Sequence, residues 1–386
     1  MSSHVLVLLL PWIAALIATP LCMRFAQARQ WVDRPGPRKR HAQPVPYLGG
    51  VAVFAAVLFG LLAAAPFVPA VREAGDGMVS LGVVGLGAAC MVALGAWDDL
   101  RELSQASRLW VEVAVAVATW LAGFRIGAVE LPFDWLIADA LLPSLLLSVG
   151  WIVLLTNAFN LIDGLDGLAT GIAICAALTL YLLASGNREA VSGVGALALA
   201  GALAGFLRFN LPPARIFLGD AGALAIGYSV AVFSIVSFQK SSTALVLAVP
   251  LLVVGVPMLD TAGAILRRVS AHLRLHGARG LAPAALGRAM FRADRDHIHF
   301  LLLRAGVSVR GVLFLLYAIS AALAGLALWI HETGSTVRWG AVALIGLAAS
   351  LLVVLLERRV ERRERLACPA VVEVSEPERV AAEGRR

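Results

Sequence analysis

Long apolar runs alternate with short polar segments along the whole chain. Many of these runs approach the ~20 residues that a helix needs to cross a hydrocarbon layer of ~30 Å. In lipid the backbone must satisfy its own polar groups, so such runs predict helices. The pattern predicts about eleven spans, at residues 5–23, 47–69, 78–97, 109–124, 136–156, 168–185, 191–207, 220–238, 243–264, 311–330 and 339–356. We therefore expect an all-α, polytopic integral membrane protein.

The Lys and Arg residues orient these predicted spans. If successive polar segments alternate between the two sides, 27 of the 32 Lys and Arg residues fall on one side. Basic loops face the cytoplasm in membrane proteins, which places the N-terminus outside and the C-terminus inside. Residues 1–356 then form a transmembrane domain, whose cytoplasmic segments are 24–46, 98–108, 157–167, 208–219 and 265–310. Residues 357–386 form a charged cytoplasmic tail, which we expect to be partly disordered.

The composition excludes several other classes of protein. Apolar residues make up 60% of the chain and charged residues 15%, against about 45–50% and about 25% in soluble domains. The net charge of +7 comes from loops between apolar runs, so we expect no nucleic-acid partner. The four cysteines lack paired spacing, which argues against a disulfide framework and a zinc site.

Polar residues gather in five places beside these spans, all on the predicted cytoplasmic side. Charged and amide side chains next to lipid are costly, so their positions indicate function. In chain order the clusters are Asp33 to His41 continuing to Gly50, Asp98–Asp99, Asn157 to Gly167, Phe217 to Gly222, and Asp294 to His299.

Three of the clusters carry oxygen ligands. The adjacent carboxylates Asp98 and Asp99 repel each other unless a cation or a proton relieves them, although a solvated pair that caps a loop is the alternative. Asp220 precedes an apolar run, where it could cap a helix or hold a metal. Oxygen-rich sites favour Mg²⁺ or Mn²⁺ over Zn²⁺. In the third cluster, where plain turn formation is the alternative, the oxygen-bearing residues are Asn157, Asn160, Asp163 and Asp166.

The fifth cluster is basic. His297 and His299 would share no face of a helix, but they can converge if the segment is extended. With Arg295 they suit phosphate oxygens better than zinc. Independent turn formers would scatter over both sides of the membrane, whereas these clusters share one side. Hard-cation ligands combined with basic groups beside a membrane fit the transfer of a phosphorylated group to a lipid acceptor. A transporter or flippase of an anionic lipid-linked substrate is the competing class, for which Asp260 is the one deep acid.

The motifs resemble those of the polyprenyl-phosphate N-acetylhexosamine-1-phosphate transferases, which form glycosyltransferase family 4. Asp98–Asp99 is similar to the family's aspartate pair, residues 157–169 to N-A-x-N-x-x-D-G-x-D-G-L-A, and residues 217–222 to F-x-G-D-x-G. Residues 32–50 and 294–306 most resemble the WecA-type branch, with the pentapeptide translocase branch second. Phe300 stands where the WecA-type branch has a histidine.

This resemblance implies a reaction and its partners. A UDP-N-acetylhexosamine, most simply UDP-GlcNAc, would donate the sugar phosphate to undecaprenyl phosphate and release UMP. This would be the first membrane step of cell-envelope polysaccharide synthesis, at the bacterial inner membrane with a cytoplasmic active site. The cofactor would be Mg²⁺, with Mn²⁺ as the alternative, and a homodimer is left open.

The resemblance also implies residue roles. Asp98 would act as the base or position the lipid phosphate, and Asp99 would assist. Asn160 and Asp220 would hold the metal. Asn157 would be a substrate-binding residue. The other substrate-binding roles would fall to Lys39 and Arg40 for the lipid phosphate, to Asp163 and Asp166 for the uridine or sugar, and to Arg295, His297 and His299 for the pyrophosphate.

Overall fold

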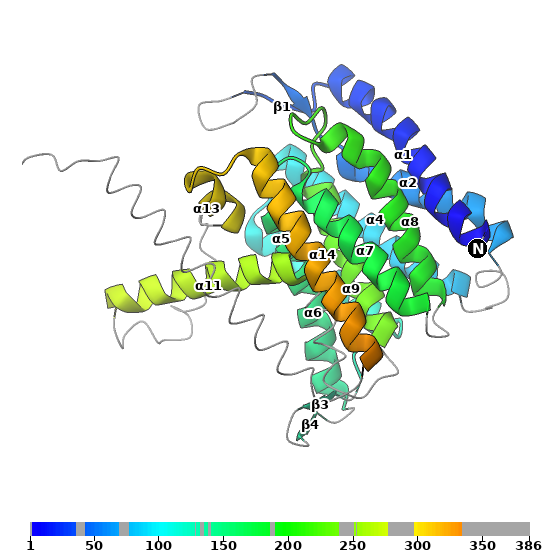
Figure 1. Ribbon diagram of the computed structural model, residues 1–386, viewed down its shortest axis with the longest axis vertical. Coiled ribbons are helices and arrows are strands. Elements are labelled where there is room, and N and C mark those ends of the chain that lie inside the picture. The colour runs from blue at the N-terminus through cyan, green and yellow to red at the C-terminus, as the bar shows by residue number, and fades with distance from the viewer. Residues whose placement is uncertain are drawn as a thin grey trace, which may run out of the picture.

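A computed structural model confirms the predicted all-α membrane fold (Figure 1). It describes residues 2–35, 43–68, 77–127, 129–131, 135–137, 140–185, 190–238, 251, 253–276 and 297–333. The α-helices there are α1 Ser2–Ala28, α2 Gly49–Ala64, α4 Gly77–Arg101, α5 Gln105–Leu121, α6 Leu141–Ile162, α7 Leu168–Ser185, α8 Ala190–Asn210, α9 Gly219–Phe238, α11 Gly255–His276, α13 Ile298–Arg304 and α14 Val309–Thr333.

Seven helices in the described part of the chain are long and apolar enough to cross a membrane, namely α1, α2, α4, α6, α8, α9 and α14. The predicted spans at 109–124 and 168–185 are also helical, as the shorter α5 and α7. The predicted span at 339–356 lies outside the described residues, as does most of the first half of the span at 243–264. The total of eleven spans and the orientation therefore remain predictions.

Helices α8 and α9 form the centre of the bundle. Of their most apolar stretches 83% is buried, against 22% for α1 at the edge. α1 packs on α2 and α8, α7 packs on α8, and both α4 and α6 pack on α9 (Figure 1). Small residues permit this close packing in lipid, since a Cβ atom at Gly227 would lie 2.6 Å from the backbone oxygen of Leu155.

Two helices extend past their predicted ends, which corrects the loop boundaries. α4 continues to Arg101 and α6 to Ile162, although apolarity alone ended these spans at residues 97 and 156. The helices continue because no glycine or proline interrupts them there. Asp98, Asp99, Asn157 and Asn160 therefore lie on the last turns of helices, which fixes their backbones more firmly than a loop would.

α11 also differs from the predicted span. It begins at Gly255 and runs to His276, well past residue 264, and projects away from the bundle in Figure 1. Its second half, rich in Arg and His, has no apolar run to hold it in lipid. The short helix α13 follows it after residues that lie outside the described part of the chain.

Two short antiparallel ribbons complete the described structure, and the sequence pattern did not predict them. β1 Val32–Asp33 pairs with β2 Val45–Pro46, in the register Val32 to Pro46 and Asp33 to Val45. β3 Val129–Leu131 pairs with β4 Trp135–Ile137. The first ribbon is tied to the segment before α9, because the Phe217 amide donates to the Pro46 carbonyl at 3.0 Å.

Candidate active site

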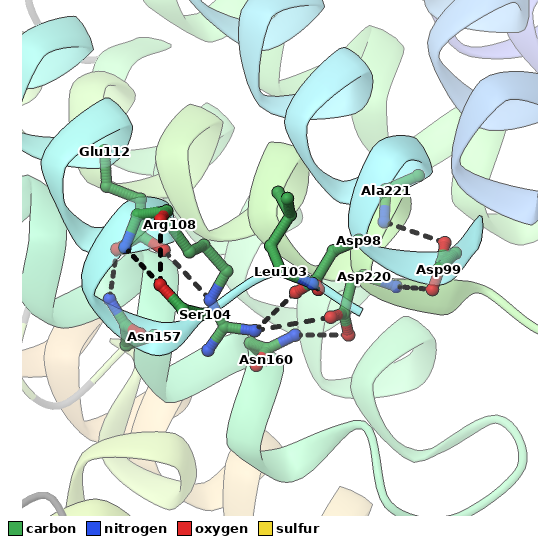
Figure 2. Close-up of polar contacts among 11 residues, drawn as sticks. Asp98, Asp99, Leu103, Ser104, Arg108, Glu112, Asn157, Asn160, Asp220 and Ala221 are labelled. Atoms are coloured by element: carbon green, nitrogen blue, oxygen red, sulfur yellow. Dashed lines mark hydrogen bonds and ion pairs between the residues drawn. The ribbon is translucent and has the colours of Figure 1, made fainter. Parts of the chain in front are cut away.

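The ends of four helices meet at one polar cluster (Figure 2). The last turns of α4 and α6 face the first turns of α5 and α9, and side chains from all four elements connect there. The cluster consists of Asp98, Asp99, Arg108, Glu112, Asn157, Asn160 and Asp220.

Asp98 is held on both carboxylate oxygens. Its Oδ1 accepts a hydrogen bond of 2.7 Å from the Leu103 amide, and its Oδ2 accepts one of 3.0 Å from Arg108 Nη1. Ser104 caps α5 by accepting from the Ser107 amide at 3.1 Å, which fixes the turn that carries Arg108. The side chain of Asp98 is 11% exposed, so this carboxylate is directed by protein contacts more than by water.

Asp99 has a different role from its neighbour. Its two oxygens accept from the backbone amides of Asp220 at 2.9 Å and Ala221 at 3.3 Å, so it caps α9 from another helix. Gly219 makes this possible: its φ is +71°, and a Cβ there would lie 2.5 Å from Asp99 Oδ2. Asp99 therefore positions the turn on which Asp220 sits.

Asp220 connects α9 to α5 and α6. Asn160 Nδ2 donates to Asp220 Oδ1 at 2.7 Å, and Arg108 Nη1 donates to Oδ2 at 3.3 Å. The same guanidinium thus bridges Asp98 and Asp220 (Figure 2). Asp98, Asn160 and Asp220, predicted from three separate motifs, lie together in one array.

Arg108 and Glu112 are site residues that the motifs did not select. Glu112 is fully buried. Its Oε1 lies 3.5 Å from Arg108 Nε, and its Oε2 accepts from Asn157 Nδ2. The sequence carried one signal for these two residues. Within an apolar stretch, an acid follows an arginine by four residues, a spacing at which the two side chains can pair on a helix. The predicted substrate-binding residue Asn157 thus directs its amide nitrogen toward Glu112 and toward the Val153 carbonyl, at 2.9 Å from the latter.

The loop between α6 and α7 carries Asp163 and Asp166. Asp166 Oδ2 accepts from the Ala214 amide at 3.0 Å, which ties this loop to the segment after α8. Tyr317 of α14 donates to the Gly167 carbonyl at 2.6 Å. Burial raises the pKa of Asp163 well above its usual value, and the nearby carboxylates, led by Asp220 and then Asp99, raise it further.

The two predicted histidines lie together against this loop. Their rings stack at 5.9 Å between centroids and 10° between planes, and a Cβ at Gly164 would lie 2.5 Å from His299 Nε2. His297 pairs with Asp260, at 2.9 Å between Nδ1 and Oδ2. Asp260 is therefore bound to a site histidine, and it is not the one deep acid, because Glu112 of α5 is fully buried within the predicted span 109–124. The other predicted basic residues, Lys39, Arg40 and Arg295, lie outside the described residues.

The cluster's chemistry fits a hard cation. The carboxylates of Asp98, Glu112 and Asp220 surround the single guanidinium of Arg108, so negative charge exceeds positive charge there. The described residues contain no ready-made group of three or more His, Cys, Asp or Glu side chains around a metal position. Mg²⁺ needs no such cage, because it keeps several waters and binds through one or two carboxylates plus substrate phosphates.

Comparisons with known proteins agree with this arrangement. A model of glycosyl transferase family 4 matches residues 81–238. The chain is 33% identical over 309 residues to a Bacillus subtilis (strain 168) protein named a probable undecaprenyl-phosphate N-acetylglucosaminyl 1-phosphate transferase, with 80% of this chain and 79% of the relative covered.

Two further relatives cover as much of the chain. The decaprenyl-phosphate N-acetylglucosaminephosphotransferase of Mycobacterium leprae (strain TN) is 28% identical, over 89% of this chain and 88% of its own. The undecaprenyl-phosphate alpha-N-acetylglucosaminyl 1-phosphate transferase of Escherichia coli (strain K12) is 25% identical, over 82% and 81%. With its polar cluster inside the matched region and a relative aligned over four-fifths of its length, the chain belongs to glycosyl transferase family 4.

Proposed function

We propose that the protein transfers N-acetylglucosamine-1-phosphate from UDP-N-acetylglucosamine to undecaprenyl phosphate and releases UMP. An oxygen of the lipid phosphate would attack the sugar-bearing phosphorus of the donor. A new P–O–P linkage would form as the bond to UMP breaks. The observation that carries the proposal is the bridge from Asp98 through Arg108 to Asp220 at the ends of membrane helices.

The bridge suits the approach of two phosphorylated substrates. Asp98 lies on the last turn of a membrane helix, where a lipid headgroup would arrive, so we assign it the role of orienting that phosphate or accepting its proton. Arg108 would then shift its hydrogen bonds from carboxylates to phosphate oxygens and stabilise their charge. Asp99 would support Asp220 through its backbone contacts.

For the metal, we propose that Asp220 and Asn160 hold Mg²⁺, with Mn²⁺ as the alternative. The bound ion would neutralise charge on the donor diphosphate. Support comes from the contact between the two side chains, in which Asn160 Nδ2 of α6 lies 2.7 Å from Asp220 Oδ1 of α9, so that two oxygen-bearing groups lie side by side. Glu112 and Asn157 would keep Arg108 in place behind this pair.

The donor would lie on the side of the α6–α7 loop. We assign Asp163 and Asp166 to the uridine or sugar, and Arg295, His297 and His299 to the pyrophosphate. Since one oxygen of Asp166 already holds the Ala214 amide, its contribution would be partly to shape the loop. Lys39 and Arg40 would attract the lipid phosphate. The site would face the cytoplasm at the bacterial inner membrane.

The test uses the purified protein with Mg²⁺, undecaprenyl phosphate and labelled UDP-sugars. We expect UMP release matched by one lipid-linked sugar diphosphate per turnover, with UDP-N-acetylglucosamine the best donor. UMP release without a lipid product would indicate a hydrolase and contradict the proposal. Product from UDP-MurNAc-pentapeptide alone would keep the reaction class and change the donor.

A further inference from the structure

Asp260 is a buried acid that none of the motifs explains. It lies in the second turn of α11, and its side chain is 1% exposed. Its Oδ2 lies 2.9 Å from His297 Nδ1, and its Oδ1 accepts a hydrogen bond of 2.6 Å from the Ile298 amide. One carboxylate therefore holds both the ring and the backbone at the start of α13.

The contact with Asp260 determines which ring nitrogen of His297 carries the hydrogen. A carboxylate accepts hydrogen bonds and cannot donate them, so the hydrogen in this contact belongs to His297 Nδ1. The ring of His297 is then fixed in orientation, with Nε2 as the nitrogen left for a further partner. A buried carboxylate holds a histidine in the same way in many metal and catalytic sites.

The histidines at the start of α13 connect Asp260 to the loop between α6 and α7. His297 is the N-cap residue of α13, and its side chain is not used to cap the helix. His299, two residues further along the chain, lies against Gly164 in the loop that carries Asp163 and Asp166. The contact at Asp260 therefore joins α11 to the His297–His299 pair, and through that pair to the acidic loop.

We propose that Asp260 is a positioning residue for donor binding: it fixes the Nδ1–H tautomer of His297 and seats the start of α13, so that the histidine pair meets the donor's anionic groups. The inference rests on the proposed function for its substrate, a nucleotide sugar diphosphate. It also makes a prediction about the His297 ring itself, which holds whether or not the donor is correctly identified.

The D260N variant separates the tautomer from the packing. An amide of the same shape has one acceptor and one donor group, whereas Asp260 serves two donors, His297 Nδ1–H and the Ile298 amide. If the amide oxygen stays on Ile298, its NH₂ group faces Nδ1 and favours the opposite tautomer, with the hydrogen on Nε2. The D260N variant can thus retain the fold while the hydrogen of the His297 ring moves from Nδ1 to Nε2.

The kinetic test compares D260N, H297Q and the double variant with wild type. We expect D260N to lower kcat/KM for the nucleotide sugar by about 10–100-fold, as loss of a residue that supports a ligand-binding histidine does. The double variant should be within about 2-fold of H297Q, because Asp260 acts through His297. Losses that multiply in the double variant, or a D260N protein as active as wild type, would overturn the proposal.

T261V is the matched control. Thr261 follows Asp260 on α11, is 7% exposed, and its hydroxyl has no hydrogen-bond partner among the described residues. We expect T261V to retain wild-type kcat/KM within about 2-fold, because the change is isosteric and removes no hydrogen bond to the described residues. A T261V loss equal to that of D260N would mean that any change in this turn of α11 is harmful, which contradicts a specific role for Asp260.

A spectroscopic test needs no turnover. The chain has seven histidines, and in ¹⁵N-histidine-labelled protein the signal absent from H297Q identifies His297. We expect a hydrogen on Nδ1 in wild type and loss of that signature in D260N. A wild-type ring protonated on Nε2 alone would overturn the proposal even if D260N does not fold. A wild type with the expected ring but no UMP release would count against the proposed function instead.

Discussion

Asn160 Nδ2 donates a 2.7 Å hydrogen bond to Asp220 Oδ1, although the two residues lie 60 positions apart. The bond joins the last turn of α6 to the first turn of α9, and these two helices pack along their length. Each residue belongs to a separate motif of the sequence. Their contact is what makes the two motifs one site, and the first prediction tests it.

Asp220→Ala should lower kcat by at least about 100-fold, on the scale of losing a key group that stabilises charge in the transition state. The change removes the carboxylate that Asn160 and Arg108 share. Asp99 would still cap α9 through the backbone amide of residue 220, so we expect the fold to survive. Turnover and thermal unfolding, measured in parallel, would check both statements. Wild-type turnover that persists in excess EDTA would end the metal assignment.

Asp98→Asn should separate acceptor chemistry from donor binding. The amide oxygen can still accept from the Leu103 amide or from Arg108, whereas the negative charge is lost. We expect affinity for the UDP-sugar to stay within a few fold of wild type while turnover collapses. Equilibrium binding of the nucleotide sugar and steady-state kinetics measure the two effects. An equal loss in both would move Asp98 to the donor site.

The helices and three oxygen-bearing residues of the polar cluster could be predicted from sequence because apolar runs and oxygen-rich motifs are local signals. Asp98, Asn160 and Asp220 were selected in this way, and all three lie in one array. Arg108 and Glu112 were missed because their importance depends on contacts between different helices. The extent of α11 was missed for another reason: a polar helix that leaves the bundle has no apolar signature.

Glu112→Ala should destabilise the protein by about 3 kcal/mol, because removal of one partner leaves other buried charges and amides uncompensated. Glu112 is fully buried and contacts both Arg108 and Asn157. Glu112→Gln keeps an acceptor for Asn157 and should cost less than Glu112→Ala. Thermal and denaturant unfolding in detergent would rank the variants. Equal stability of wild type and Glu112→Ala would show that the contacts of Glu112 with Arg108 and Asn157 do not stabilise the fold.

Asp163→Asn should stabilise the metal-free protein while it lowers activity. Burial and the neighbouring carboxylates raise the pKa of Asp163 well above its usual value, so its ionisation opposes folding. The wild-type protein should therefore lose stability as the pH rises from about 3.9, the unfolded value, to the raised folded value. Asparagine removes this loss. The gain in Tm over wild type should grow with pH across that window, and a gain that shrinks would contradict the assignment.

The last prediction concerns Phe300, which stands where the WecA-type branch has a histidine. Its ring lies 4.2 Å from that of His299 between centroids, and a Cβ at Gly164 would be 3.4 Å from its Cζ atom. Phe300 thus lies against both His299 and the loop that carries Asp163 and Asp166, where the donor's sugar would lie.

Because of these contacts, we expect Phe300→His to change the ratio of kcat/KM for UDP-N-acetylglucosamine over UDP-N-acetylgalactosamine by about 10-fold, within the range that one altered pocket contact supplies. Phe300→Leu is the control, since it keeps an apolar anchor at the start of α13 and adds no phosphate-binding group. Competition between the two labelled donors measures the ratio directly. If both variants keep the wild-type ratio, Phe300 only anchors α13, and the choice of donor must come from the loop that carries Asp163 and Asp166.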